Sequence, residues 1–420
     1  MKRVIFHIDV NSAFLSWEAV YRLYHLGAKT DLREEIAAVG GDMAMRHGII
    51  LAKSIPAKKY GIKTGESIME AKQKCPDLKL VPPNYQLYDG CSGAFMDILR
   101  QYSPEVEQYS IDEAFVDMTG TEALWGDAVT AANRIRVQIR EELGFTVNIG
   151  VSENKLLAKM ASDFKKPDRV HTLWKEEIPD KMWPLPVSEL FFVGRATTKK
   201  LFALGIRTIG ELAASDPHML RSHLKKQGEI IWGFANGIDV SVVQPEAPAN
   251  KGYGNSTTIA FDVCDASVAK LVLLSLAETV GTRLREAGVR AEVIAVGIKR
   301  FDLRYASHQM TLQNATNITA EIHRYACRLF DSLWDGTPIR HLGIHTGRIK
   351  DGCSLRQMDL FDDTDYEKLE QLDGTVDQIR RRYGIDSVKR AAFTGSRIDH
   401  MGGGISREKR TVDYSKISID

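Results

Sequence analysis

Hydrophobic and polar positions along the chain predict helices and strands in mixed order. Short runs rich in β-branched and aromatic residues indicate strands, and the clearest near the start are KRVIFHIDV, GIILAKSI, EVEQYSI, AFVDM and TVNIGVS. Helical spacing of apolar residues predicts helices in SAFLSWEAVYRLYHLG, ESIMEAKQKC, GAFMDILRQY, NKLLAKMASDFKK and, as one long helix, ALWGDAVTAANRIRVQIREELG. Because the two kinds of element do not alternate strictly, the pattern favours an α+β fold over a doubly wound sheet.

The pattern changes from about residue 187. Up to residue 239 it is wholly helical, and the segment SVVQPEAPANKG that follows, with its two prolines, is typical of an extended linker. Beyond it, the strand-like runs STTIAFDV, AEVIAVGIKRF and ASHQMTL accompany the helical VAKLVLLSLAETVGTRLREAG, which predicts a second α+β domain. From residue 351 this order is lost, although YEKLEQLDGTVDQIRRRYG is compatible with a helix. We therefore predict an α+β multidomain protein.

Composition narrows the class of protein. A chain of 420 residues, with 44% hydrophobic and 26% charged residues, is typical of a globular protein with several domains. The short apolar start, broken by His7 and Asp9, predicts no signal peptide, and no run of about 18 apolar residues predicts a membrane span. Five scattered cysteines without a CxxC pair indicate a reducing compartment and no zinc site, so we expect a cytoplasmic protein. The net charge of +1 does not show which partners the protein has.

Two acids stand side by side in the otherwise apolar stretch QYSIDEAFVDM. If the flanking strands pair as a hairpin, Asp112 and Glu113 form its two-residue turn, where both side chains can lean the same way. Such turns prefer Asn-Gly or Asp-Gly, so Asp-Glu is an unfavourable pair at this position. Residues that are unfavourable for the local structure often have a functional role. An exposed acidic turn is the alternative interpretation.

Asp9 adds a third carboxylate at the end of the first hydrophobic strand, just before a helix. Carboxylates at strand ends form a hard oxygen site that suits Mg²⁺ and leaves room for phosphate oxygens. A two-metal site of this kind supports in-line attack at phosphorus.

Three segments, FHIDVNSAF, YSIDEAFVDM and TVNIGVSENKLLAKMASDFKKPD, resemble the signature motifs of bacterial Y-family (DinB/UmuC-type) translesion DNA polymerases. The resemblance runs in order from residue 1 to about 350, and the DVN form together with Lys58 leans to the UmuC-like branch. It implies a right-hand polymerase with the following parts: palm 1–12 and 83–169, small fingers 13–82, helical thumb 170–239, linker 240–251, little finger 252–350 and a tail, 351–420.

The resemblance also implies roles for residues at the palm. Asp9, Asp112 and Glu113 would be the catalytic ligands of two Mg²⁺ ions, with the Val10 carbonyl as a further ligand. Phe14 would be the steric gate, whose ring lies under the sugar and excludes a 2′-hydroxyl. An ordinary core position in its helix is the alternative for Phe14.

Lysines are candidates for binding the incoming triphosphate. Lys155 and Lys159 stand four residues apart on one helix face, where like charges destabilise a helix slightly unless an anion binds. A solvated lysine face is the alternative. By resemblance, Lys58 falls where many relatives have a phosphate-binding Arg, and Ile55 replaces the Tyr that commonly accompanies it. Lys58 keeps the positive charge of that Arg but cannot bind a phosphate through two parallel hydrogen bonds.

Two further motifs point to partners. LFFVGRATTKKLFALGIRTIGELA resembles a helix–hairpin–helix, which contacts DNA phosphates through backbone N–H groups. Gly194 and Arg195 are its DNA-binding candidates, Phe192 replaces the first hairpin Gly, and a plain αα-hairpin is the alternative. QMDLF matches the bacterial sliding-clamp-binding pattern, and its residues are Gln357, Met358, Asp359, Leu360 and Phe361.

The resemblance therefore predicts a monomeric, template-dependent, low-fidelity polymerase that adds dNTPs to a primer on template DNA, in DNA damage tolerance and SOS mutagenesis. The main rival is a non-catalytic polymerase homologue that acts as a DNA- and clamp-binding adaptor. The presence of all three carboxylates argues against that rival. A weaker rival is a two-metal nuclease or phosphatase.

Overall fold

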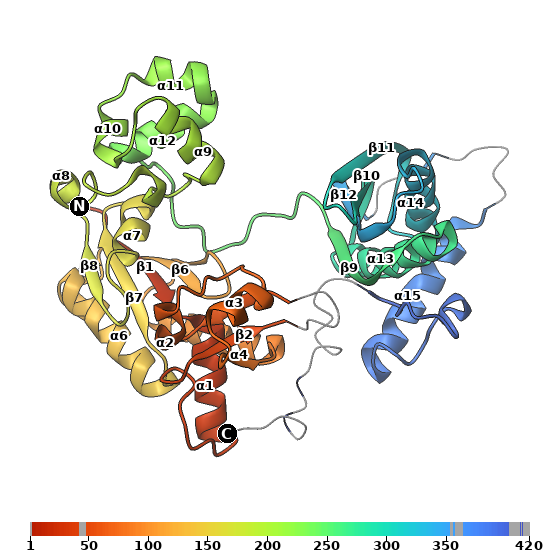
Figure 1. The fold of residues 1–420 in the computed structure, drawn as a ribbon, viewed down its shortest axis with the longest axis horizontal. Coiled ribbons are helices and arrows are strands. Elements are labelled where there is room, and N and C mark those ends of the chain that lie inside the picture. The colour runs from red at the N-terminus through yellow and green to blue at the C-terminus, as the bar shows by residue number, and fades with distance from the viewer. Residues whose placement is uncertain are drawn as a thin grey trace.

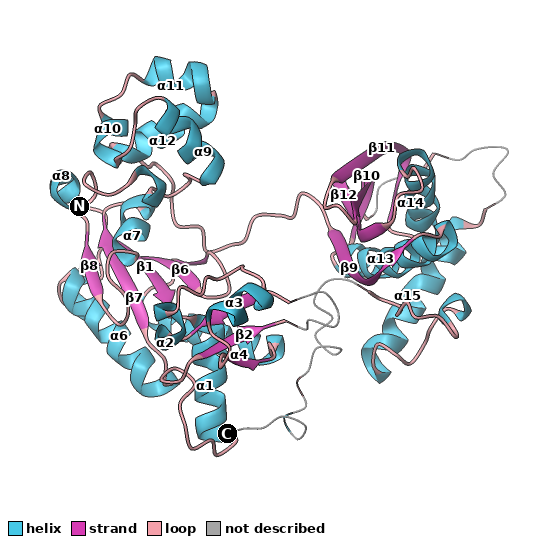
Figure 2. Ribbon diagram, in the orientation of Figure 1, coloured by secondary structure: helices cyan, strands magenta, loops and turns pink. Residues whose placement is uncertain are grey.

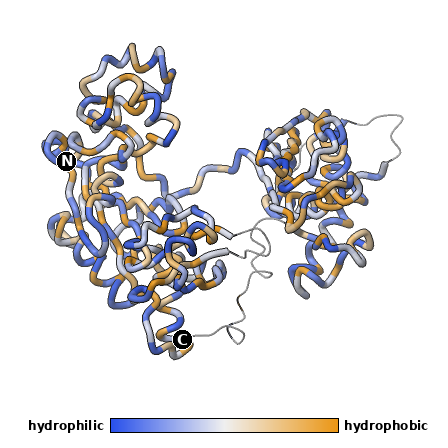
Figure 3. The backbone as a smooth tube through the Cα atoms, viewed as in Figure 1, coloured by the Kyte–Doolittle hydropathy of each residue, from blue (hydrophilic) through white to orange (hydrophobic). Residues whose placement is uncertain are grey.

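The chain folds into two α+β parts that are joined by an extended linker (Figure 1). The computed structural model describes residues 2–41, 48–352, 356–357, 364–402, 412 and 414. Hydrophobic and hydrophilic positions are interleaved along each folded part (Figure 3). Within the described ranges, no helix is long and apolar enough to cross a membrane. The predicted α+β multidomain class is confirmed.

A five-stranded sheet forms the centre of the first part (Figure 2). Its order is β5-β6-β1-β7-β8, and its neighbours run antiparallel except for the parallel pair of β7 and β8. In chain order the strands are β1 (Ile5–Val10), β5 (Val106–Gln108), β6 (Glu113–Asp117), β7 (Val147–Ser152) and β8 (Val170–Thr172).

Strand β1 reads as a continuous hydrophobic run because helices cover both faces of the sheet. Its even-numbered residues, Phe6, Ile8 and Val10, pack into the core with α4 (Tyr85–Tyr102) and α6 (Ala128–Leu143). Its odd-numbered residues, Ile5, His7 and Asp9, face α7 (Lys155–Ser162). A Cβ at Gly150 of β7 would overlap the backbone of α7, so this helix packs directly on the sheet.

A second, smaller sheet lies beside the first. It has the order β3-β2-β4, and α1 packs on it through Leu15 and Ala19. Ser54 caps α2, and Ser67 and Glu70 form a capping box at α3. The elements are α1 (Ala13–His25), β2 (Ala37–Gly40), β3 (Ile50–Lys53), α2 (Ile55–Lys59), α3 (Ile68–Lys74) and β4 (Lys79–Val81).

Two predictions about local structure were wrong. The long helix expected from ALWG to EELG is broken into α5 (Glu122–Trp125) and α6, because Gly126 has φ 82° and Asp127 caps α6 through the N–H groups of Val129 and Thr130. The hairpin turn does not fall at residues 112–113. It spans 109–112, and Glu113 is already the first residue of β6, since its carbonyl accepts the N–H groups of Tyr109 and Ser110.

The predicted helical region follows the sheet. Its core includes Leu156 and Met160 of α7, so it packs against the first part. The linker does not leave the sheet at once, because Val243 is buried with Ile5, Phe115 and Ala158. The helices are α8 (Ile178–Lys181), α9 (Arg195–Ala203), α10 (Ile209–Ala213), α11 (Pro217–Leu224) and α12 (Lys226–Ala235), with short 3₁₀ turns at Lys175–Glu177 and Val187–Glu189.

The second part is an antiparallel four-stranded sheet of order β11-β10-β12-β9, packed against two helices. The expected strands and the long helix are present, whereas α14 and β12 were not anticipated. In chain order the elements are β9 (Gly254–Val263), α13 (Ala266–Glu286), β10 (Val289–Arg300), β11 (Tyr305–Thr316), α14 (Thr319–Leu333) and β12 (Ile339–Asp351).

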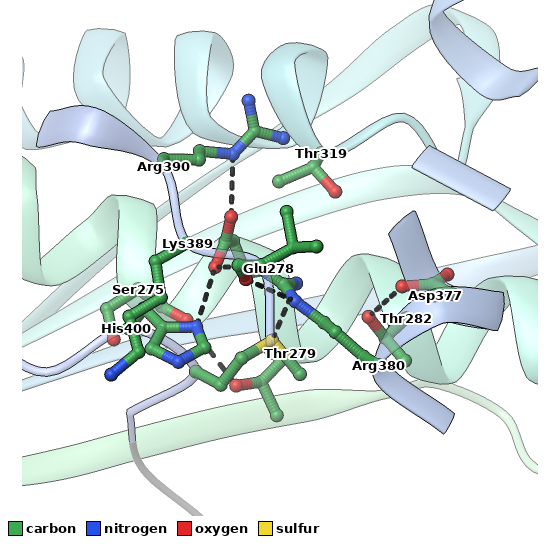
Figure 4. Close-up of polar contacts among 12 residues, drawn as sticks. Ser275, Glu278, Thr279, Thr282, Thr319, Asp377, Arg380, Lys389, Arg390 and His400 are labelled. Carbon is green, nitrogen blue, oxygen red and sulfur yellow. Dashed lines mark hydrogen bonds and ion pairs between the residues drawn. The ribbon is translucent and has the colours of Figure 1, made fainter. Parts of the chain in front are cut away.

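The segment 364–402 also packs on this second part. It contains the expected helix, α15 (Tyr366–Tyr383), and a 3₁₀ turn at Ala391–Phe393. Glu278 of α13, only 2% exposed, accepts hydrogen bonds from Arg390 Nε at 2.6 Å and Arg380 Nη2 at 3.2 Å (Figure 4). Arg285 of α13 in turn donates to Asp377 at 2.6 Å. Buried charges of both signs therefore fasten the segment to α13.

The backbone at Phe192 is strained. This residue has φ 72°, the left-handed region that a side chain with a Cβ rarely adopts, and its ring is 54% exposed. The ring meets Phe191 and Phe234 at centroid distances of 4.9 and 5.8 Å. It thus takes the left-handed position of a turn where glycine would be free of strain.

We predict that Phe192→Gly is more stable than Phe192→Ala by about 1 kcal/mol, because both variants lose the ring and only glycine loses the strain. Thermal unfolding followed by circular dichroism measures the difference. At Phe202 in α9, also exposed, the order should reverse, since alanine is the better helix former. The same order at both positions would contradict the strain.

We predict that Glu278→Gln weakens the attachment of α15 by about 3 kcal/mol, because it leaves Arg380 without its buried counter-charge and leaves Arg390 with Asp373 alone. Amide exchange within α15 should become faster. The control is Glu286→Gln, which removes a surface pair to Arg381 at 3.6 Å and should change little. Equal exchange in the two variants would contradict the role of Glu278.

Candidate active site

Three carboxylates meet at one end of the five-stranded sheet. Asp9 of β1 and Glu113 of β6 are directly opposite each other in the strand register. Asp112 lies next to them in the turn, where its carbonyl accepts the N–H of Val10 at 3.0 Å. Its carboxylate accepts the Ser110 hydroxyl at 2.7 Å. The turn therefore brings Asp112 to the site from outside the strand, and the strand pairing brings the other two.

Two lysines pair with Asp9 and Glu113. Lys159 of α7 places Nζ 3.1 Å from Glu113 Oε2 and 3.8 Å from Asp9 Oδ2. Lys166, in the segment after α7, donates to Asp9 Oδ1 at 2.6 Å. Two anions held so close to apolar walls would otherwise resist ionising together.

The two carboxylates of this pair have opposite pKa shifts. Burial raises the pKa of Asp9 above its ordinary value, although Lys166 and Lys159 favour the ionised form. Burial acts on Glu113 in the same direction, but the hydrogen bond from His7 and the charge of Lys159 outweigh it and lower the pKa of Glu113. Asp9 is thus the acid that most needs a cation in order to stay ionised.

His7 fixes the position of Glu113. The imidazole is fully buried, and burial lowers the pKa of His7 to about 4, so it is neutral near pH 7. Its Nε2 lies 3.2 Å from Glu113 Oε2, and its Nδ1 lies 2.8 Å from the Ser162 hydroxyl. Because an ionised carboxylate only accepts, Nε2 carries the proton, and Nδ1 faces the Ser162 hydroxyl, whose single proton has both Nδ1 and the Lys159 carbonyl at 2.8 Å as acceptors.

A cavity of about 260 Å³ opens beside the acids. Its lining includes Asp9, Asp112, Phe14, Lys53 and Thr64. The Phe14 ring is stacked on Tyr88 at 4.5 Å with an interplanar angle of 8°, which fixes it as one wall. Burial and the charge of nearby Lys58 lower the pKa of Lys53, so a bound anion would stabilise its charged form.

Other predicted residues lie outside this cluster. Both carboxylate oxygens of Glu107 accept the Lys155 amine at 2.7 Å, and Oε2 also accepts the Gln244 N–H at 2.8 Å, so Lys155 holds the start of the linker. Lys58 is exposed on α2 and does not line the cavity. Gly194 caps α9 and Arg195 is its first residue, in the helical region.

Only one residue of QMDLF, the predicted clamp-binding motif, is described. Gln357 is described, and its N–H donates to Asn314 Oδ1 at 2.7 Å. Met358, Asp359, Leu360 and Phe361 lie outside the described residues.

Sequence reasoning missed His7, Lys53 and Lys166. Lys166 follows α7, which ends at Ser162, so helical spacing could not place it. Lys53 ends β3 two residues after Leu51, and both line the cavity, as alternation along a strand allows. His7 had one signal, a polar residue two positions before Asp9 in a fully buried strand.

The donor set fits a hard divalent cation, because Asp9 and Asp112 line one cavity, Glu113 stands opposite Asp9, and flexible ammonium groups pair with Asp9 and Glu113. The three acids are spread around those lysines. Among the described residues, the group of His and acidic side chains with ligand atoms all within 4.8 Å of one another is Asp386, Asp399 and His400. There Asp386 already pairs with Lys389 at 2.9 Å and with His400 at 2.8 Å.

Known proteins with similar sequences share this organisation. Residues 8–163 match the impB/mucB/samB family, residues 250–360 its C-terminal domain, and residues 175–206 the IMS family HHH motif. DNA polymerase IV of Clostridium acetobutylicum is 45% identical over 394 residues, which cover 94% of this chain and 98% of that protein. DNA polymerase IV 1 of Bacillus subtilis is 37% identical over 93% of each chain.

The chain is also similar in fold to solved structures. A Y-family DNA polymerase chimera of Dbh and Dpo4 matches with a TM-score of 0.71 over 82% of this chain and 99% of the chimera. At 22% identity this likeness concerns the fold alone.

The predicted leaning to the UmuC-like branch stays a prediction. Both relatives are named DNA polymerase IV, and these names do not test the branch. Asn11 of the DVN motif also has a structural role here. Its Oδ1 accepts the Thr146 hydroxyl at 3.0 Å and the Asp168 N–H at 2.9 Å, which ties the end of β1 to two loops.

By its similarity over nearly its whole length, the chain belongs to the impB/mucB/samB family, the Y-family polymerases that its motifs resemble.

Proposed function

We propose that this chain is a template-dependent translesion DNA polymerase, which adds deoxynucleotides to a primer 3′ end with low fidelity. The observation that carries the proposal is the meeting of Asp9, Asp112 and Glu113 beside a cavity that Phe14 walls. The substrates are then primer–template DNA and a dNTP, as the name of the relatives suggests.

The three acids and the Val10 carbonyl would hold two Mg²⁺ ions. When bound, such ions lower the pKa of an attacking hydroxyl and neutralise phosphate oxygens. His7 holds Glu113 in place through its Nε2 proton. Lys159 and Lys166 now balance the acids, and they are free to turn to phosphate oxygens once metal ions replace them.

The cavity walls would select the nucleotide. Phe14, fixed by its stack on Tyr88, is the steric gate under the sugar. Lys53 and Thr64 bind each other at 3.1 Å on the cavity wall and can receive the triphosphate. Lys58 is near enough to affect the charge of Lys53 and is an outer phosphate contact. Lys155, held by Glu107, supports the linker instead.

The parts of the fold would divide the work as in a right hand. The five-stranded sheet is the palm, the small sheet the fingers, α8 to α12 the thumb, and the sheet after the linker the little finger. Gly194 has open space where a Cβ would stand, so a DNA phosphate can approach the N-terminus of α9. We propose a monomer, with QMDLF as the site for a bacterial sliding clamp.

We predict that Asp112→Ala lowers the rate of primer extension with Mg²⁺ at least about 100-fold, because it removes a charge at the reacting centre. Primer extension on a defined template measures the rate. The matched control is Asp117→Asn at the other end of β6, which should stay close to wild type. A wild-type protein that binds primer–template but does not extend it would support the adaptor and overturn the proposal. Loss of primer would support a nuclease.

We predict that changing Leu360 and Phe361 together to Ala weakens binding to a purified bacterial sliding clamp at least about tenfold, because such apolar anchors dominate peptide docking. Extension without the clamp should be unchanged. Leu372→Ala, an exposed leucine of α15 outside the motif, is the control. Undiminished clamp stimulation in the double variant would refute this assignment.

A further inference from the structure

The C-terminal end of the chain returns to the first helix. The Tyr414 hydroxyl donates to Glu18 Oε2 at 3.0 Å and accepts from Asn84 Nδ2 at 3.0 Å. Its ring lies 5.3 Å from the Tyr21 ring and 5.9 Å from the Arg22 guanidinium. One tyrosine thus contacts α1 at three positions and the cap residue of α4.

The polar groups at this contact are unusually buried. Glu18 is 0% exposed and Arg22 is 1% exposed, and they bind each other at 2.8 Å. Burial raises the pKa of Glu18, while Arg22 and the Tyr414 hydroxyl favour its ionised form. Burial likewise raises the pKa of the Tyr414 hydroxyl, which keeps it protonated as a donor. A buried carboxylate needs partners for its oxygens, and Tyr414 supplies one of them.

The contact lies directly behind the candidate sugar pocket. Glu18 is one helical turn after Phe14 on α1. Asn84 caps α4 by accepting the Leu87 N–H, and Tyr88 in that helix stacks on Phe14. Tyr414 therefore binds the same two helices that hold the Phe14 ring.

The chain just before this end is fastened to the second part. Besides the Glu278 network, the Gly402 carbonyl accepts Asn255 Nδ2 at 2.9 Å and its N–H donates to the Ser275 hydroxyl at 2.6 Å. From residue 402 to residue 414 an extended chain reaches at most about 40 Å. Gly402 is thus bound to the second part, and Tyr414, twelve residues later, is bound to the first part.

We propose that the site formed by Glu18, Arg22, Tyr21 and Asn84 is a docking site for Tyr414, and that Tyr414, together with the segment 364–402 bound to the second part, acts as a strap between the second part and α1. With both ends bound, the strap limits how far the second part can move from the first. The linker joins the two parts covalently, and the docking of Tyr414 adds a second, non-covalent connection between them. The docking itself does not depend on the proposed polymerase activity.

The test compares Tyr414→Ala with wild type in the full-length protein without DNA. Amide exchange in α1 around Glu18 should rise about tenfold, because two hydrogen bonds and a ring contact are lost. Small-angle X-ray scattering should show a larger radius of gyration. Tyr414→Phe keeps the ring and should give a smaller rise in exchange. Tyr383→Ala, an exposed tyrosine of α15, is the control and should match wild type.

Unchanged exchange in α1 of Tyr414→Ala would overturn the docking site. Faster exchange with an unchanged radius of gyration would overturn the strap. Primer extension by the same variants separates this inference from the proposed function, since neither outcome requires activity to change.

Discussion

The balance of charge at the end of β1 is the constraint on which the rest of the first part depends. Asp9 and Glu113 are brought face to face by strand pairing, and their repulsion has to be offset inside a covered sheet. Lys159 and Lys166 offset it from α7 and from the segment that follows. For the first of these to reach, α7 must lie directly on β7, which is why Gly150 cannot carry a side chain. His7 then uses the same face of β1 to hold Glu113.

In the second part, too, buried acids are paired with basic side chains. Glu278, Asp373 and Asp377 are buried acids, and each is met by an arginine. At the first site the acids are balanced by lysines. Lysines have flexible side chains and do not form bidentate bonds, so a cation of higher charge can replace them. At the second site, planar guanidinium groups meet the acids through several bonds, which suits a permanent joint. The choice of lysine or arginine thus separates a site that can exchange partners from one that fastens two segments.

Much of the fold and of the site was predictable from local patterns. The strand containing Asp9, the acids at 112 and 113, and the helix carrying Lys159 were all expected. The errors arose where one or two residues decide the local path: Gly126 breaks a helix, and the turn of the hairpin begins three residues earlier than expected and ends at Asp112. Lys166 and Lys53 could not be assigned, because irregular segments and sheet packing place them. Nor does periodicity show that Lys155 pairs with Glu107, which is a long-range contact.

That contact changes how the linker works as a hinge. Glu107 accepts the Gln244 N–H, Asp239 accepts the Leu156 N–H, and Val243 is buried against the sheet. Residues up to 244 are therefore held by the first part, and the unattached stretch of the linker begins near Pro245, the first proline of the segment. The reach of the linker is shorter by roughly 15 Å than its proline-rich sequence alone implies. The segment that tethers the second part to the first is correspondingly shorter, which limits the distance between the two parts.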